Sequence, residues 1–183
     1  MKVSMNRSRK NLRQSVSYDQ ALVLARQKSF DTEQVRAKLE RASKQGDARA
    51  MYAIATWYLH GAHKTKVDLK TAIRLLRRAA NANVSDALFD LAVATETGIG
   101  GIEINLRKAF VLYLRAALAG DSEAMSEVGR CYYHGIGVDR DREIARPWLE
   151  RGKSRDERVG QRSKKPHQGS RSLKSASAVR KTK

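Results

Sequence analysis

The residues with the most potential for chemistry are two glycine-rich runs, four histidines and one cysteine. The runs Gly98-Ile99-Gly100-Gly101 and Gly135-Ile136-Gly137 look like phosphate loops. A dinucleotide site, however, needs G-x-G-x-x-G between a strand and a helix. Both runs instead follow a predicted helix and recur at a fixed spacing, so we interpret them as turns that end helices.

The histidines and the cysteine do not form a recognisable reactive set. His60 and His63 lie near each other in sequence, and His134 is the repeat equivalent of His60. No Cys or carboxylate beside them completes the three or four ligands of a metal site. Cys131 has no partner for an intrachain disulfide and no obvious base beside it, which favours a packing role over a nucleophile. Arg130 beside it is a weak indication of a lowered thiol pKa. With no Ser/His/Asp or paired-carboxylate pattern, we expect no metal site and no enzyme.

These residues sit in elements that repeat every 37 residues. First helices are predicted over residues 47–60, 85–97 and 121–134, with apolar residues on one stripe and a glycine after the last turn. The small residue in each stripe predicts a close helix–helix contact. The repeating sets are Gly61, Gly98 and Gly135; Ala50, Ala87 and Ala124; Ile54, Leu91 and Val128; and Ala55, Ala92 and Gly129.

Second helices share a pattern of their own. Apolar residues follow Asp68 and Asn105 at the same helical offsets, and these two residues are predicted N-caps because their side chains can accept a backbone N–H. One period earlier, Asp31 opens another helical stretch, and Asp141 opens the last helix after a one-residue deletion. Pro147 is expected to kink or shorten that helix. The chain therefore contains a partial unit and three further units, with atypical ends.

The pattern of a small residue, a tyrosine and a glycine, followed by a capped Ala-rich helix, resembles the Sel-1-like repeat family, relatives of tetratricopeptide repeats. The closest stretch is AMSEVGRCYYHGIGV, residues 124–138, whereas Thr95 replaces the repeat tyrosine. The resemblance implies an all-α, right-handed α-α superhelical solenoid of about three and a half helix-turn-helix repeats, which acts as an adaptor without a cofactor. We expect a partial repeat at 18–46, repeats at 47–83, 84–120 and 121–153, and tails at 1–17 and 154–183.

Binding is expected on the first helices, which line the concave face in tetratricopeptide-like stacks. Asp86, Asp90, Glu123 and Glu127 would make the concave groove acidic. Such a groove favours a partner segment that carries Lys or Arg. The alternative is an ordinary solvated helix face. Trp57 is expected either to be half-exposed and available to a ligand or to pack internally. The candidate residues are Arg49, Thr56, Trp57, His60, Asp86, Asp90, Glu123, Glu127, Arg130 and His134.

The net charge of +18 lies mostly in the tails. Residues 1–17 carry +5 and residues 151–183 carry +10, so the middle carries only +3. The composition predicts disordered tails. An alternative function is therefore non-specific RNA or DNA binding, while other interpretations are solubilising tails or tails that fold into the acidic groove. The residues for nucleic-acid binding would be Arg7, Arg9, Lys10, Arg13, Lys164, Lys165, Arg171, Lys174, Arg180, Lys181 and Lys183.

Location is the last expectation from the sequence. No apolar stretch approaches the length needed to span a bilayer, and no apolar core of a secretory signal follows the basic start. A single cysteine fits a reducing compartment. We expect a cytoplasmic protein that binds a protein partner.

Overall fold

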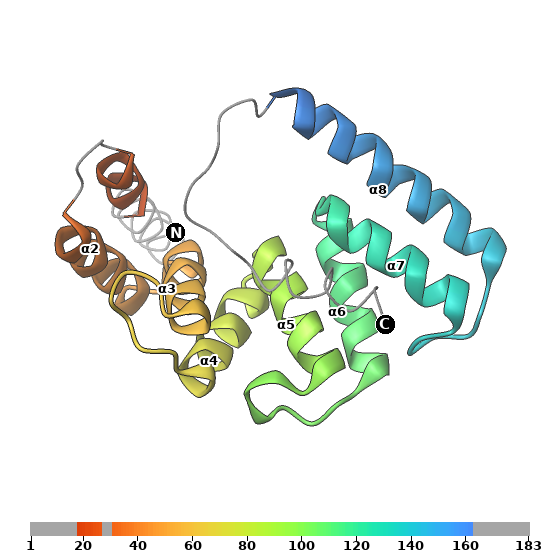
Figure 1. Ribbon diagram of the computed structural model, residues 1–183, viewed down its shortest axis with the longest axis horizontal. Coiled ribbons are helices and arrows are strands. Elements are labelled where there is room, and N and C mark those ends of the chain that lie inside the picture. The colour runs from red at the N-terminus through yellow and green to blue at the C-terminus, as the bar shows by residue number, and fades with distance from the viewer. Residues whose placement is uncertain (1–17, 27–30, 163–183) are drawn as a thin grey trace, which may run out of the picture. The chain divides into compact units, whose positions relative to one another are not determined.

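The computed structural model describes residues 18–26 and 31–162, and their side chains as far as residue 153 (Figure 1). The described residues form helices joined by short loops, with no strand among them, as predicted for an all-α chain. After a helical segment over residues 18–25, the elements are α2 (Thr32–Lys44), α3 (Ala48–His60), α4 (Leu69–Asn81), α5 (Ser85–Thr97), the short 3-10 turn η1 (Ile99–Gly101), α6 (Leu106–Leu118), α7 (Ser122–His134) and α8 (Arg142–Arg162).

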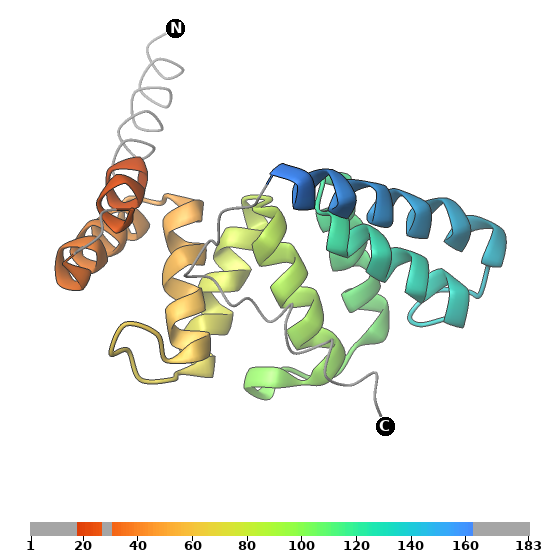
Figure 2. The same ribbon diagram turned by 45° about the horizontal axis from the view of Figure 1, so that its top comes forward.

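The chain divides into two compact units, and the division falls inside α4, after Ala79. In the first unit, α2 packs against α3. In the second unit, α5 packs on α6, α6 on α7, and α7 on α8. Figures 1 and 2 both show α7 and α8 side by side along most of the length of α7. Consecutive antiparallel helices are the packing expected of helical repeats.

Side chains of aspartate and asparagine cap the starts of most helices. Asp47 and Asp121 precede α3 and α7, and their carboxylates accept backbone N–H groups from the first turn. Asn105 does the same for α6, accepting from the N–H of Lys108 at 2.8 Å. The α5 helix differs, because Val84 stands at the equivalent place and offers no side-chain cap. Asp31, Asp68 and Asp141 also accept N–H groups two or three residues ahead, as predicted.

Left-handed residues recur with the 37-residue period at three kinds of position. Gly61, Gly98 and Gly135 end the first helices at φ values between 67° and 78°, as predicted. Further along each loop a second left-handed position is held by His63, Gly100 and Gly137. A third, after the second helix, is held by Gly46, Asn83 and Gly120. The chain reversals are thus set by residues that adopt positive φ, and His63 and its neighbour Lys64 (φ 60°) are the bulky exceptions.

The core lies along the predicted apolar stripes. Ala50, Ala87 and Ala124 are fully buried in the first helices. Gly129 has no room for a side chain, because a Cβ there would lie 2.6 Å from Cγ of Leu149 on α8. The close helix contact predicted at this small-residue position is therefore present between α7 and α8.

The last helix differs from its prediction in two ways. Pro147 lies within α8 and does not shorten it, because the helix runs on to Arg162. Proline at this place removes only the bond to the carbonyl of Glu143, and both residues are exposed, so water can reach that carbonyl. The helix thus runs past the expected tail boundary at 153/154, through residues 154–162, which are mostly good helix formers.

Candidate interaction surface

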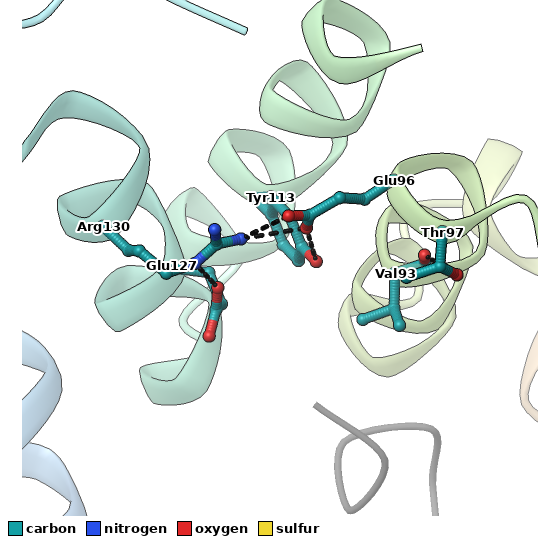
Figure 3. Close-up of polar contacts among 6 residues, drawn as sticks. All are labelled: Val93, Glu96, Thr97, Tyr113, Glu127 and Arg130. Carbon is teal, nitrogen blue, oxygen red and sulfur yellow. Dashed lines mark hydrogen bonds and ion pairs between the residues drawn. The ribbon is translucent and has the colours of Figure 1, made fainter. Parts of the chain in front are cut away.

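A polar network joins three consecutive helices of the second unit (Figure 3). The Nη2 atom of Arg130 on α7 lies 2.8 and 2.9 Å from the two carboxylate oxygens of Glu96 on α5. The Nε atom of Arg130 donates to Glu127, one turn earlier on α7. Tyr113 on α6 donates its hydroxyl proton to Glu96 at 2.8 Å. In Figure 3 the carboxylate of Glu96 lies between the side chains of Tyr113 and Arg130.

Two members of this network, Arg130 and Tyr113, keep their protons over a wide pH range. Burial opposes the charged form of Arg130, but Glu127 and Glu96 outweigh it and raise the pKa of the guanidinium above its usual value. Burial, reinforced by the charge of Glu96, raises the pKa of Tyr113, so its hydroxyl stays protonated and remains a donor. A set of groups that holds its protons in this way is suited to positioning helices rather than to transferring a proton.

Cys131 packs in the interior. Its side chain is 1% exposed, and burial raises the pKa of its thiol to about 12, although the charge of Arg130 acts in the opposite direction. The expected packing role is therefore confirmed, and Arg130 does lower the pKa of this thiol as suggested, but burial outweighs its effect. A thiol that stays protonated at neutral pH is a poor nucleophile.

Of the candidate binding residues, those predicted on α7 lie together on one side of their helix and reach the surface. Glu123, Glu127, Arg130 and His134 are spaced by four, three and four residues, which places them on one side of the helix. Glu123 and His134 are exposed, while Glu127 and Arg130 are half-buried. All four side chains therefore reach the surface to some degree.

The candidate residues on α5 do not form the expected acidic centre. Asp90 is fully buried and Asp86 is half-buried, so the prediction of an accessible Asp90 is wrong. The cause is that every residue of α5 from 87 to 95 is buried, so packing covers the whole circumference of the helix. Farther along the same helix, the half-buried Thr97 uses its hydroxyl to bond the carbonyl of Val93 at 2.7 Å.

Two of the four candidates on α3 are also buried. Trp57 is 8% exposed and its ring lies 4.6 Å from that of His63, so it packs internally and is not half-exposed. Thr56 is buried and donates its hydroxyl proton to the carbonyl of Ala53 at 2.8 Å. These two side chains face neighbouring chain rather than solvent, which leaves them little exposed surface for a partner.

Arg49 and His60, the other candidates on α3, are exposed. Arg49 pairs with Asp19 at 3.2 Å and lies over the ring of Tyr18, with 4.4 Å to the ring centroid. It therefore holds the helical segment 18–25 against α3 within the first unit. His60 is the last residue of α3 and stays at the surface.

One surface residue was missed in the sequence. Tyr133, on the edge of the α7 stripe, is 40% exposed. The Cζ atom of Arg142 lies over the tyrosine ring, 5.0 Å from the ring centroid. The ring of His134 lies 4.8 Å away. Comparison of the repeats could have pointed to Tyr133, because the residues at the equivalent positions differ in character. They are Leu59, which is buried, and Glu96, which belongs to the polar network.

Other expected features either lie outside the described residues or are not formed by them. The tail residues predicted to bind nucleic acid fall at 1–17 and 163–183, outside the described part of the chain. In the part that is described, no three His, Cys, Asp or Glu side chains converge as metal ligands. The helices of that part also include none with the length and apolar character needed to cross a membrane.

The arrangement matches a known repeat family. The model of the Sel1 repeat matches residues 48–84, 85–121 and 122–156, which differ by only one to three residues from the predicted repeat boundaries. The chain belongs to the Sel1 repeat family, as the sequence resemblance predicted, and its fold is the all-α solenoid of that family. Proteins built from Sel1 repeats generally act as non-catalytic scaffolds for protein–protein interaction.

Several solved structures are similar. A Sel1 repeat protein from Oxalobacter formigenes shares 32% identity at a TM-score of 0.60, over 69% of this chain and 94% of that one. A protective antigen of uropathogenic Escherichia coli gives 0.69 at 22% identity, over 78% of this chain but only 30% of its own length. The Helicobacter pylori cysteine rich protein B gives 0.51 at 20% identity, over 63% and 86%. The last two show the fold alone, and no curated protein matches the chain.

Proposed function

We propose that this chain is a non-enzymatic scaffold that binds a partner protein through the α7 surface, by which we mean Glu123, Glu127, Arg130, Tyr133 and His134. The observation that carries the proposal is the exposed ring of Tyr133, which contacts both the guanidinium of Arg142 and the ring of His134. Tyrosine and arginine are typical of binding hot spots. A ring that is already held in place loses little conformational freedom when a partner binds.

The charge of this surface indicates the chemistry of the partner. Arg130 is neutralised by its pairs with Glu96 and Glu127, so the network keeps a net negative charge, and the exposed Glu123 adds to it. An acidic rim favours a partner segment that carries Lys or Arg. The proposed partner is therefore the one expected from the sequence, but its contact surface is α7 and does not include Asp90.

Crosslinking can test where the partner binds. A photoreactive amino acid would replace Tyr133 in one protein and Val111, which is exposed on α6, in a matched control. In a native lysate, we expect a discrete crosslinked protein from position 133 that persists at high salt, because an interface with an aromatic centre is not purely electrostatic. Equal crosslinking from both positions, or none from position 133, would contradict the proposal.

Affinity provides the second test once the partner is captured. Tyr133→Ala is expected to weaken binding about tenfold or more, which is the effect of losing a hot-spot side chain. Leu118→Ala, which removes an exposed apolar side chain from α6, is the control and is expected to leave affinity unchanged. A cytoplasmic location, the lack of catalysis and nucleic-acid binding by the tails stay predictions.

A further inference from the structure

Four cations lie in a row on the exposed face of α4. Lys70, Arg74, Arg77 and Arg78 stand at offsets 0, 4, 7 and 8, which places them within an arc of about 100° and about 12 Å of helix length. All four are exposed, while the residues of the opposite face are buried. We refer to these four residues as the cation row, and all of them belong to the first unit.

The cation row has no acidic counterpart among the described residues. None of the ion pairs within residues 18–26 and 31–153 includes a member of the row. The nearest acid in sequence is Asp68, which accepts the N–H of Thr71 at 3.0 Å as a helix cap. That bond lowers the pKa of Asp68, and the charge of Arg74 adds a smaller effect. Like charges three and four residues apart repel on a helix, and a bound anion would relieve this repulsion.

The repeat architecture does not require these cations. In α6, one period later, the equivalents of Lys70, Arg74, Arg77 and Arg78 are Arg107, Val111, Leu114 and Arg115. Arg115 is engaged by the carbonyl of Ala80 at 3.2 Å and the side chain of Asn83 at 2.7 Å. The two central positions are thus apolar in α6, so the cation row is a property of α4 and not of the fold.

The composition of the row indicates the class of ligand. The exposed residues of α4 are all polar, and none is aromatic, so this face lacks the apolar centre typical of a protein interface and the rings that stack on unpaired bases. Three of its four cations are arginines, whose planar groups pair with phosphate oxygens through two donors. Lys and Arg clustered along one face of a helix form the kind of basic stripe that contacts nucleic-acid phosphates.

We propose that the cation row of α4 binds the phosphate backbone of nucleic acid without reading the base sequence. The cation row lies on a different helix from the α7 surface, so an experiment can disprove one of the two proposed sites without affecting the other. An acidic polypeptide is the competing ligand for the same charges, and the test below separates the two.

The experiment uses the full chain and measures the salt dependence of binding to labelled DNA duplexes of two unrelated sequences. The row variant replaces Lys70, Arg74, Arg77 and Arg78 with Gln. The control variant replaces Arg107, Lys108, Arg140 and Lys153, four exposed cations of the second unit, with Gln. Both variants lose the same net charge. If each row residue meets one phosphate, the slope of log K against log[salt] becomes less steep by about 3.6 in the row variant.

The expected result is that slope change in the row variant only, with similar affinity for both duplexes. Equal losses in the row and control variants would overturn the proposal, because net charge alone would then explain binding. Poly-glutamate that competes as strongly as the duplex, with the same dependence on the row, would also overturn it. Circular dichroism checks folding, and if the row variant does not fold, Arg74→Gln/Arg77→Gln is compared with Arg107→Gln/Lys108→Gln for a slope change of about 1.8.

Discussion

Replacing Gly137 with alanine is expected to destabilise the second unit strongly, and replacing Gly101 in the same way only mildly. Both glycines have left-handed backbone, with φ of 71° and 75°. A Cβ at Gly101 would meet nothing within 4 Å. A Cβ at Gly137 would overlap the carbonyl of Leu106, the first residue of α6, and would lie 2.9 Å from the backbone nitrogen of Arg107. The pair therefore separates backbone strain from close contact.

The magnitudes follow from these two effects. Left-handed backbone costs alanine about 1 to 2 kcal/mol, partly offset by about 0.4 to 1 kcal/mol from the less flexible unfolded chain. Gly101→Ala should therefore lower the free energy of unfolding by about 1 kcal/mol or less. At Gly137 the Cβ meets backbone, which cannot rotate away, so an overpacking cost of about 1 to 3 kcal/mol is added. We expect Gly137→Ala to lose about 2 to 4 kcal/mol in total.

Urea unfolding followed by far-UV circular dichroism measures both variants under the same conditions. Asparagine provides a further control, because it tolerates left-handed backbone better than alanine but is larger. Gly101→Asn should be milder than Gly101→Ala, whereas Gly137→Asn should be no milder than Gly137→Ala. If the two alanine variants differ by less than about 0.5 kcal/mol, the α7–α8 loop does not lie against the start of α6 and the reasoning is refuted.

Four further predictions follow from the described contacts. Val84→Asp should supply the missing cap of α5 and raise the free energy of unfolding by about 1 kcal/mol in urea titration; an unchanged value would contradict this. Arg74→Glu should raise the free energy of unfolding by roughly 0.5 to 1 kcal/mol at low salt, because it removes like-charge repulsion, and by less at high salt. The melting temperature, measured at both salt concentrations, should rise accordingly. Tyr113→Phe should cost about 1.5 to 3 kcal/mol by removing the hydrogen bond to Glu96, measured by urea unfolding. Because burial raises the pKa of Cys131 from 9.0 to about 12, its contribution to stability is complete below pH 9 and is lost as the pH rises toward 12, so Cys131→Ala should flatten the stability profile over that range.

The helices were predictable because their signals are local. Asp47 and Asp121 cap helices through their own first turns, and Gly61 and Gly135 end them by adopting positive φ. Such interactions depend on a few adjacent residues, and the 37-residue period then repeats them. The same locality explains why the start of α8 at Asp141 was predicted but its continuation past Pro147 was not, since a single proline is tolerated where the freed carbonyl is exposed.

The candidate binding surface was harder to predict, because the burial of a helix residue depends on other helices that are distant in the sequence. Asp90 and Trp57 lie away from the apolar stripe of their helices, yet both are buried. A helix inside a stack has neighbours on several sides, so its polar side is not necessarily solvated. Glu96 and Tyr113 could have been suspected together, because Glu96 stands at the position of Leu59, and Tyr113 at the position of Leu76 and Leu149, in other repeats. Their pairing, however, became clear only from the geometry of three helices.

The network around Glu96 also bears on how the units tell one another apart. A chain made of similar units can pair a helix with the wrong neighbour, either within one molecule or by exchange between two molecules. The positions equivalent to Tyr113 hold Leu76 and Leu149, and those equivalent to Arg130 hold Thr56 and Val93. A pairing displaced by one unit would bury the carboxylate of Glu96 against side chains that carry no charge, at a cost of several kcal/mol. The network around Glu96 thus favours one alignment of the repeats and penalises the others.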